Sequence, residues 1–87
     1  MTFSNRELIR RFVEGKTSGK ACNMEIREAD GKTLLVGYGW ARYAERQKDS
    51  GEITLFDGWY GYSSTTSRHV NMVRSHADYE SGMKPRV

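Results

Sequence analysis

The amino-acid sequence predicts an α+β domain in which two helices pack on a three-stranded antiparallel sheet, in the order α-β-β-β-α. Apolar residues recur with helical spacing near the N-terminus, alternate with period two in the middle of the chain, and return to helical spacing near its C-terminal end. A chain of 87 residues has room for one hydrophobic core. We therefore expect a single domain over residues 1–77, followed by a flexible tail over residues 78–87.

The first predicted helix covers residues 5–14. Ser4 and Glu7 have the S-x-x-E spacing of a capping box, which satisfies free N–H groups at a helix start. Gly15 can adopt the left-handed conformation that often ends a helix. The apolar stripe between these signals consists of Leu8, Ile9, Phe12 and Val13. The stretch 15–20, "GKTSGK", follows and has the composition of a linker.

A hairpin is predicted around Asp30 and Gly31, because this pair is typical of two-residue β-turns. Centring the turn on these residues pairs Ala29 with Lys32, Ile26 with Leu35, Met24 with Gly37 and Cys22 with Gly39. The second strand then covers residues 32–46 and is expected to bend near its two glycines. The turn "KDSG" leads to a third strand over 52–59. Pairing Gln47 with Glu52 sets Tyr43 opposite Phe56, Arg42 opposite Asp57 and Trp40 opposite Trp59.

The second helix is predicted over residues 66–77. The run of hydroxyl residues at 63–67 supplies N-caps for it, since Ser and Thr side chains accept hydrogen bonds from the first N–H groups of a helix. Its narrow apolar stripe consists of His69, Val70, Val73 and Ala77. A stripe this narrow must pack on the sheet to be stable.

The predicted register divides the sheet into two faces. The core face carries Cys22, Met24, Ile26, Leu35, Gly37, Gly39, Ala41, Tyr43 and Phe56. The other face carries Asn23, Glu25, Arg27, Leu34, Val36, Tyr38, Trp40, Arg42, Asp57 and Trp59. Because two short helices can cover only one face, we expect the second face to be open.

Composition restricts the cellular environments and the partners that we expect for the protein. Fourteen Lys and Arg residues against eleven Asp and Glu give a net charge of +3, which suits nucleic acid, a nucleoprotein or an acidic protein surface. No apolar run approaches the ~18 residues that span a bilayer, so we expect neither a leader peptide nor a membrane partner. The single cysteine, Cys22, favours a reducing compartment. We predict a cytoplasmic location.

Catalytic chemistry has little support in the sequence. Hydroxyl residues adjoin His69, so a small hydrolase centred on this histidine is one alternative. However, the G-x-S-x-G elbow is absent, and hydroxyl runs before helices usually act as caps. His69 and His76 lie seven residues apart and lack the spacing of a helical zinc site. We predict no catalytic residue, no metal and no cofactor.

Binding chemistry is better represented. Aromatic rings interleaved with arginines on a sheet face are typical of single-stranded nucleic-acid binding and also of protein hot spots. The rings can instead be covered by the tail, by the second helix or by a second copy of the chain in a homodimer. The predicted partner-binding residues are Tyr38, Trp40, Trp59, Arg27 and Arg42, with further charge from Arg6, Arg10 and Arg68.

The stretch 62–71, "YSSTTSRHVN", resembles a Y-S-x-T-T-S-[KR]-H-x-N signature of small phage and prophage proteins without an assigned activity. "GYGWARYA" at 37–44 is similar to the strand that precedes it. The resemblance implies a viral or mobile-element origin and supplies no catalytic residue. Small phage proteins of this kind include anti-CRISPR proteins. We therefore expect a non-enzymatic anti-CRISPR-type inhibitor that binds a host protein or nucleoprotein; direct binding of single-stranded nucleic acid is the alternative.

Overall fold

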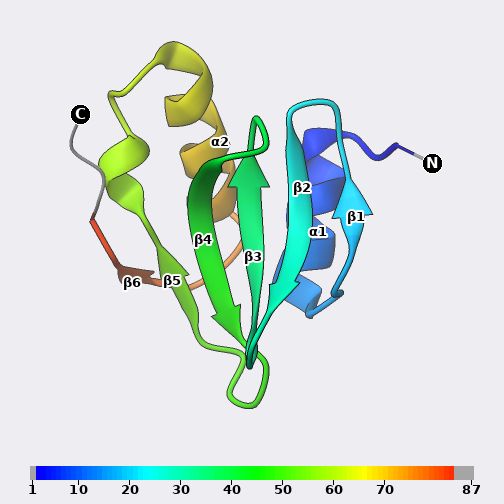
Figure 1. The fold of residues 1–87 in the computed structure, drawn as a ribbon. Helices are drawn as coiled ribbons and strands as arrows, with labels where there is room; N and C mark the ends of the chain where they lie inside the picture. The colour runs from blue at the N-terminus through cyan, green and yellow to red at the C-terminus, as the bar shows by residue number, and fades with distance from the viewer. Residues whose placement is uncertain (1, 84–87) are drawn as a thin grey trace.

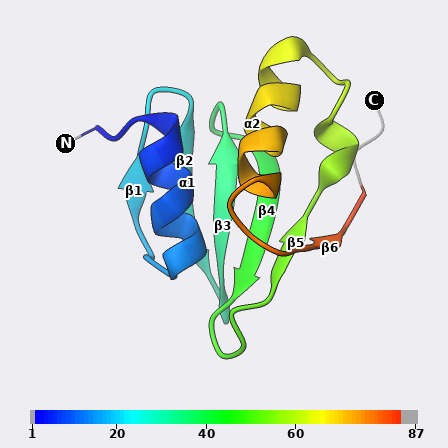
Figure 2. The same cartoon turned by 180° about the vertical axis from the view of Figure 1, so that it is seen from behind.

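A computed structural model describes residues 2–83 and shows an α+β fold with two helices on one face of a mixed sheet (Figures 1 and 2). The sheet has six strands in chain order, β1-β2-β3-β4-β5-β6. Neighbouring strands are antiparallel, except that β6 runs parallel to β5. The elements are α1 (Asn5–Glu14), β1 (Gly19–Lys20), β2 (Met24–Ala29), β3 (Lys32–Gly37), β4 (Ala41–Gln47), β5 (Ile53–Leu55), the 3-10 helix η1 (Asp57–Trp59), α2 (Ser64–Arg74) and β6 (Glu80–Ser81).

The first helix has the predicted boundaries. The Ser4 side chain accepts a hydrogen bond from the Glu7 N–H at 3.1 Å. Gly15 ends the helix with φ at 97°, and its N–H donates to the carbonyls of the preceding turn. Leu8, Ile9 and Phe12 are fully buried. Local capping and one apolar stripe therefore determine α1.

The predicted hairpin at Asp30 and Gly31 is confirmed for most of its length. Ile26 lies opposite Leu35, and the pairing continues to Met24 and Gly37. The predicted pairing of Cys22 with Gly39 is wrong. The Ala21 N–H donates to the Met24 carbonyl at 2.8 Å, and this tight turn takes the chain out of the strand. Cys22 is therefore exposed.

The prediction of one long second strand is wrong. The chain reverses fully at Tyr38 and Gly39, where φ is 56° and 80°. Gly37 permits the reversal to pack closely, since a Cβ atom at this position would lie 2.4 Å from the Tyr43 ring. A bulge follows in β4, where Arg42 lies opposite Val36 but Ala44 lies opposite Leu35. The extra residue is Tyr43, and the bulge directs its side chain into the core.

The predicted alignment of the last hairpin is confirmed near its turn. The Gln47 N–H donates to the Glu52 carbonyl at 2.9 Å, and the Phe56 N–H donates to the Tyr43 carbonyl at 2.8 Å. The strand itself ends at Leu55, where η1 begins to form. The predicted strand pairs of Arg42 with Asp57 and of Trp40 with Trp59 are therefore absent.

The predicted three-stranded antiparallel sheet is wrong, because the long strand is divided into β3 and β4 and the two-residue strands β1 and β6 are added. β1 comes from the stretch expected to be a linker, and a parallel bridge between Phe3 and Ala21 lies beside it. β6 comes from the expected tail, and the Gly82 N–H donates to the Leu55 carbonyl at 2.8 Å. Strands of two residues are too short to leave a periodic pattern. The rest of the expected tail, 84–87, lies outside the described residues.

The second helix begins two residues before the predicted start and ends three before the predicted end. Ser63 is its N-cap, and Ser63 and Thr66 form a reciprocal capping box. His69, Val70 and Val73 face the core as predicted. Within residues 2–83, no helix has the length and apolar character that a membrane crossing requires.

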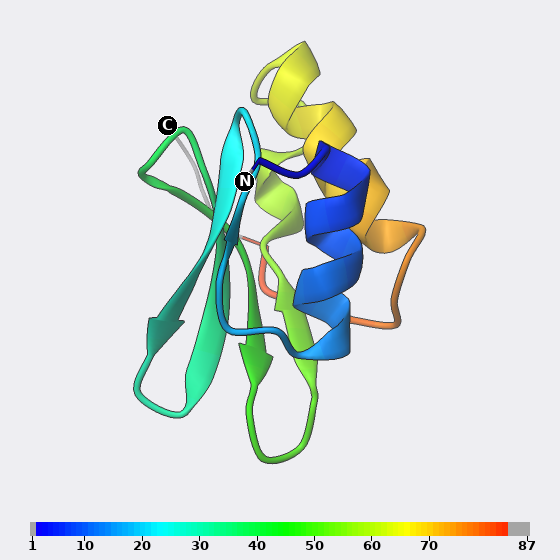
Figure 3. The same ribbon diagram turned by 90° about the vertical axis from the view of Figure 1, so that its right-hand side faces the viewer.

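Both helices lie on the same side of the sheet (Figure 3). The core between the two layers consists of Leu8, Ile9, Phe12, Ala21, Met24, Ile26, Leu35, Ala41, Tyr43, Ala44, Ile53, Leu55, Trp59, Val70 and Val73. On the opposite face, Leu34 and Val36 are also buried. Their cross-strand neighbours are charged side chains, including Arg27 and Arg42. This face is therefore less open than predicted.

Candidate functional site

Four large aromatic side chains are exposed at the end of the molecule where β3 turns into β4 and η1 leads into α2, the upper end in Figure 1. Their exposed fractions are 48% for Tyr38, 63% for Trp40, 55% for Tyr60 and 44% for Tyr62. Tyr38 and Trp40 were predicted as partner-binding residues, whereas Tyr60 and Tyr62 were not. The available signal was their position beside Trp59, directly before the hydroxyl run.

Trp59 anchors this end of the molecule from inside. Its ring meets Trp40 at 5.4 Å and Tyr62 at 4.9 Å between ring centroids, both edge-on. Its Nε1–H donates to the Arg42 carbonyl at 2.9 Å. The prediction that Trp59 lies on the open face is wrong, because η1 turns the indole into the core, where it is 5% exposed. We call Trp40, Trp59 and Tyr62 the aromatic cluster.

Tyr38 has a backbone conformation that is unusual for a bulky residue. Its φ of 56° lies in the left-handed region, which costs roughly 1–2 kcal/mol for a residue with a Cβ atom. The phenol ring lies over the imidazole of His69, with ring centroids 6.1 Å apart and planes inclined by 29°. The turn thus holds part of Tyr38 against α2 and leaves about half of it exposed.

His69 is buried below Tyr38, with 2% of its surface exposed. Its Nδ1 lies 3.0 Å from Tyr43 Oη, and the Asn5 amide nitrogen lies 3.4 Å from its Nε2. Burial, with a smaller contribution from the Arg68 charge, lowers the pKa of His69. Burial also raises the pKa of the Tyr43 phenol. Both imidazole nitrogens are engaged in joining α1, α2 and β4, so a hydrolase centred on His69 gains no support from this geometry.

Arg27 and Arg42 lie on the sheet face away from the helices and are both paired with carboxylates. Arg27 donates to Glu25 at 3.1 Å and to the Gly39 carbonyl at 3.0 Å. The Arg27 hydrogen bond lowers the pKa of Glu25. Arg42 donates to Glu45 at 3.3 Å, and Lys32 donates to the same carboxylate at 3.2 Å. The charge of these two arginines is therefore partly compensated.

The remaining predicted arginines belong to the helical layer. Arg6 and Arg10 are exposed on α1, and Arg68 is exposed on α2. Because both helices cover the face opposite Arg27 and Arg42, the eight predicted residues do not form one surface. The structure brings together Trp40 and Trp59, adds Tyr62, and separates the arginines into two layers.

A groove runs along the exposed side of α2. Its volume is about 620 Å³, and we call it the α2 groove. The lining residues are Tyr60, Ser64, Ser67, Arg68, Asn71, Met72 and Ser75. One aromatic, one cation and several hydrogen-bonding side chains therefore share one concave surface, and none of the described residues that line it is acidic.

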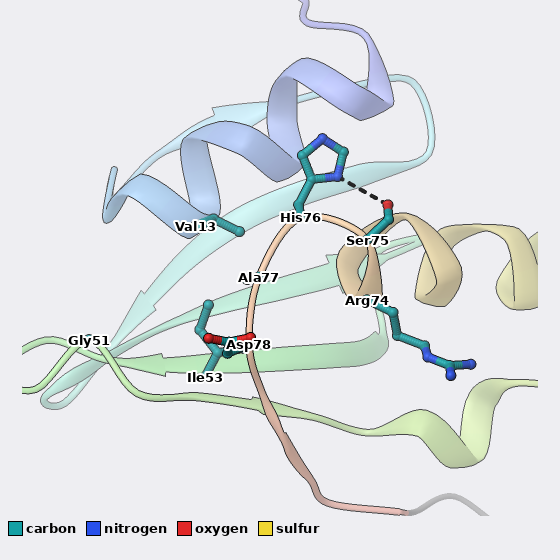
Figure 4. Close-up of a pocket in the computed structure, with 8 residues that line it drawn as sticks. All are labelled: Val13, Gly51, Ile53, Arg74, Ser75, His76, Ala77 and Asp78. Atoms are coloured by element: carbon teal, nitrogen blue, oxygen red, sulfur yellow. Dashed lines mark hydrogen bonds between the residues drawn. The ribbon is translucent and has the colours of Figure 1, made fainter.

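A second hollow of about 610 Å³ lies where the C-terminal ends of both helices approach the β4–β5 turn. It is lined by Val13, Gly51, Ile53, Arg74, Ser75, His76, Ala77 and Asp78. Figure 4 shows the side chains of His76 and Arg74 pointing in different directions. Its ionisable groups therefore do not converge on one point. Within residues 2–83, no three His, Cys, Asp or Glu side chains are grouped to hold a metal ion.

Comparison with known proteins gives no match: no family model, no curated protein and no solved structure is similar to this chain.

Proposed function

We propose that this chain is a non-enzymatic binding protein of a phage or mobile element that inhibits a host nucleoprotein, in the manner of an anti-CRISPR protein, through the aromatic cluster. The observation that carries the proposal is the exposure of Trp40 above a buried partner. Trp40 is 63% exposed, whereas Trp59 below it is 5% exposed and hydrogen-bonded to the backbone. Tryptophan is prominent among the residues that dominate binding energy at protein interfaces.

Preorganisation strengthens this interpretation. Trp40 lies at a tight turn and packs edge-on against a ring that is itself held from two sides. A partner that covers Trp40 gains apolar contact with a ring that already packs on Trp59. The surface is therefore suited to binding a folded macromolecule.

The phage origin rests on the resemblance of residues 62–71, and the structure gives several residues of that stretch a local role. Ser63 and Thr66 cap α2, and the Ser67 hydroxyl accepts from the Gly61 N–H at 2.7 Å. Tyr62 packs on Trp59, and His69 fills the core. These structural roles favour the interpretation that the signature maintains the fold and does not form a catalytic site.

The test uses purified protein and a panel of reconstituted CRISPR effector complexes, with cleavage or binding of target DNA as the readout. We expect inhibition of at least one complex. Trp40→Ala should weaken that inhibition at least tenfold. Met83→Ala, which truncates an exposed apolar side chain outside the cluster, is the matched control and should inhibit like the parent protein. The proposal is overturned if the parent protein neither binds nor inhibits any complex.

A further inference from the structure

Arg68 lies on the exposed side of α2 and lines the α2 groove. Among residues 2–83, Arg27 and Arg42 form ion pairs and Arg68 forms none. The sequence has no aspartate or glutamate from residue 58 to residue 77, although this stretch includes Arg68 and Arg74. Within the part of the chain that the structure describes, no carboxylate pairs with Arg68 or lines the α2 groove, so its positive charge favours an anionic ligand.

The polar side chains of the α2 groove have donors to offer. The Ser67 hydroxyl accepts from the Gly61 N–H, so its own proton is available for donation. The side-chain oxygen of Asn71 accepts from Arg74 Nη1 at 3.4 Å, which leaves the side-chain N–H groups of Asn71 to donate. Phosphate oxygens accept such bonds. The hydrogen-bonding character of the groove thus agrees with its charge.

Tyr60 adds an aromatic surface to the same groove. It is 55% exposed and lines the wall that faces α2. An exposed ring beside donors and an arginine is the arrangement that holds single strands, in which a base stacks on the ring and the phosphate meets the cation. A base paired inside a duplex cannot stack in this way.

We propose that the α2 groove binds single-stranded nucleic acid, with Tyr60 stacking on a base and Arg68, Ser67 and Asn71 contacting the adjoining phosphates. Among the described residues, the groove lining shares no member with the aromatic cluster, so the proposal does not depend on inhibition of a nucleoprotein. If this proposal and the proposed function both hold, the groove binds an exposed nucleic-acid strand of the nucleoprotein while Trp40 contacts its protein.

The experiment measures fluorescence anisotropy of labelled twelve-nucleotide dT and U strands and of a twelve-base-pair duplex, at two salt concentrations. We expect both single strands to bind more tightly than the duplex. Tyr60→Ala should weaken single-strand binding about tenfold, the loss typical of one stacked base. Arg68→Ala should weaken binding and reduce the salt dependence by about 0.7 in log–log slope, the value for one phosphate contact. Lys16→Ala removes an exposed charge outside the groove and should leave binding unchanged.

Tyr60 and Arg68 are both exposed, so their alanine variants should melt at the parent temperature. Circular dichroism checks this. The proposal is overturned if no strand binds at low salt, if the duplex binds as tightly as the strands, or if Tyr60→Ala and Arg68→Ala bind like the parent protein. Inhibition that depends on Trp40, together with absence of strand binding, overturns this inference and leaves the proposed function standing.

Discussion

Trp40 and Trp59 meet edge-on with ring centroids 5.4 Å apart, yet the first is 63% exposed and the second is 5% exposed. One indole of the pair faces solvent and the other belongs to the core. This contact couples the proposed recognition surface to the packed interior, because any movement of Trp59 changes the support under Trp40. The two tryptophans should therefore respond differently to mutation and to solvent probes.

The first prediction separates the two indoles by fluorescence. In Trp59→Phe, the remaining Trp40 should emit at long wavelength and be quenched readily by acrylamide. In Trp40→Phe, the remaining Trp59 should emit at shorter wavelength and be protected. Trp59→Phe should also lower the free energy of unfolding by about 1–3 kcal/mol, since the Arg42 carbonyl loses its donor. Equal quenching of the two variants would contradict the burial of Trp59.

The second prediction concerns the close packing at Gly37. Gly37→Ala should lower the free energy of unfolding by about 3 kcal/mol or more, because the new Cβ atom would lie 2.4 Å from the Tyr43 ring inside a packed core. Gly31→Ala is the matched control. Its φ of 71° is left-handed but its surroundings are empty, so we expect a loss of only ~1–2 kcal/mol. Urea denaturation measures both, and equal losses would count against the packing described for the β3–β4 turn.

The third prediction is a pH dependence of stability caused by His69. Its pKa is lowered in the folded state, so below the unfolded value of about 6.5 the unfolded chain binds more protons. The stabilisation from neutral His69 is complete above that value and is lost as the pH falls toward the folded pKa. The free energy of unfolding should therefore decrease as the pH falls below about 6.5.

Three variants assign that pH dependence. His69→Gln should remove the decrease measured by urea denaturation at successive pH values, whereas His76→Gln should retain it. Arg68→Ala should make it smaller, because the Arg68 charge contributes to lowering the pKa of His69. A decrease of the same size in His69→Gln would assign it to other groups.

The fourth prediction tests the role of the hydroxyl run. Ser63→Ala should lower the free energy of unfolding by about 1 kcal/mol, since the Thr66 N–H loses the side-chain acceptor at 3.1 Å that caps α2. Ser64→Ala, one residue along the chain and exposed, should change it by less than about 0.5 kcal/mol. Thermal unfolding of the two variants checks the difference. A larger effect at Ser64 would place the cap elsewhere.

The parts of the fold that were predicted correctly depend on residues close together in the chain. Ser4 and Gly15 mark the ends of α1, and the Asp30-Gly31 turn determines which residues pair across β2 and β3. The alignment of Gln47 with Glu52 is likewise a consequence of a short turn. In each case a few neighbouring residues restrict the backbone, and the sequence displays them directly.

The candidate site was predicted only in part, because its residues take their roles from distant contacts. Trp40 was expected to be exposed and is. Trp59 has the same local character, and its burial results from contacts with Tyr43 and Tyr62 and from the Arg42 carbonyl. Arg68 was expected to supplement the sheet arginines, yet it lies in the opposite layer.

The sequence by itself determined the α+β class, both helices and the two hairpin alignments near their turns, since caps, turns and hydrophobic periodicity act over a few residues. Only the tertiary structure decided that the chain reverses at Tyr38, that short strands extend the sheet, and which aromatic rings are exposed. Those outcomes depend on how side chains from separate elements fill one core. Gly37 illustrates the difference, because its need for a hydrogen in place of Cβ becomes evident only when the Tyr43 ring is packed against it.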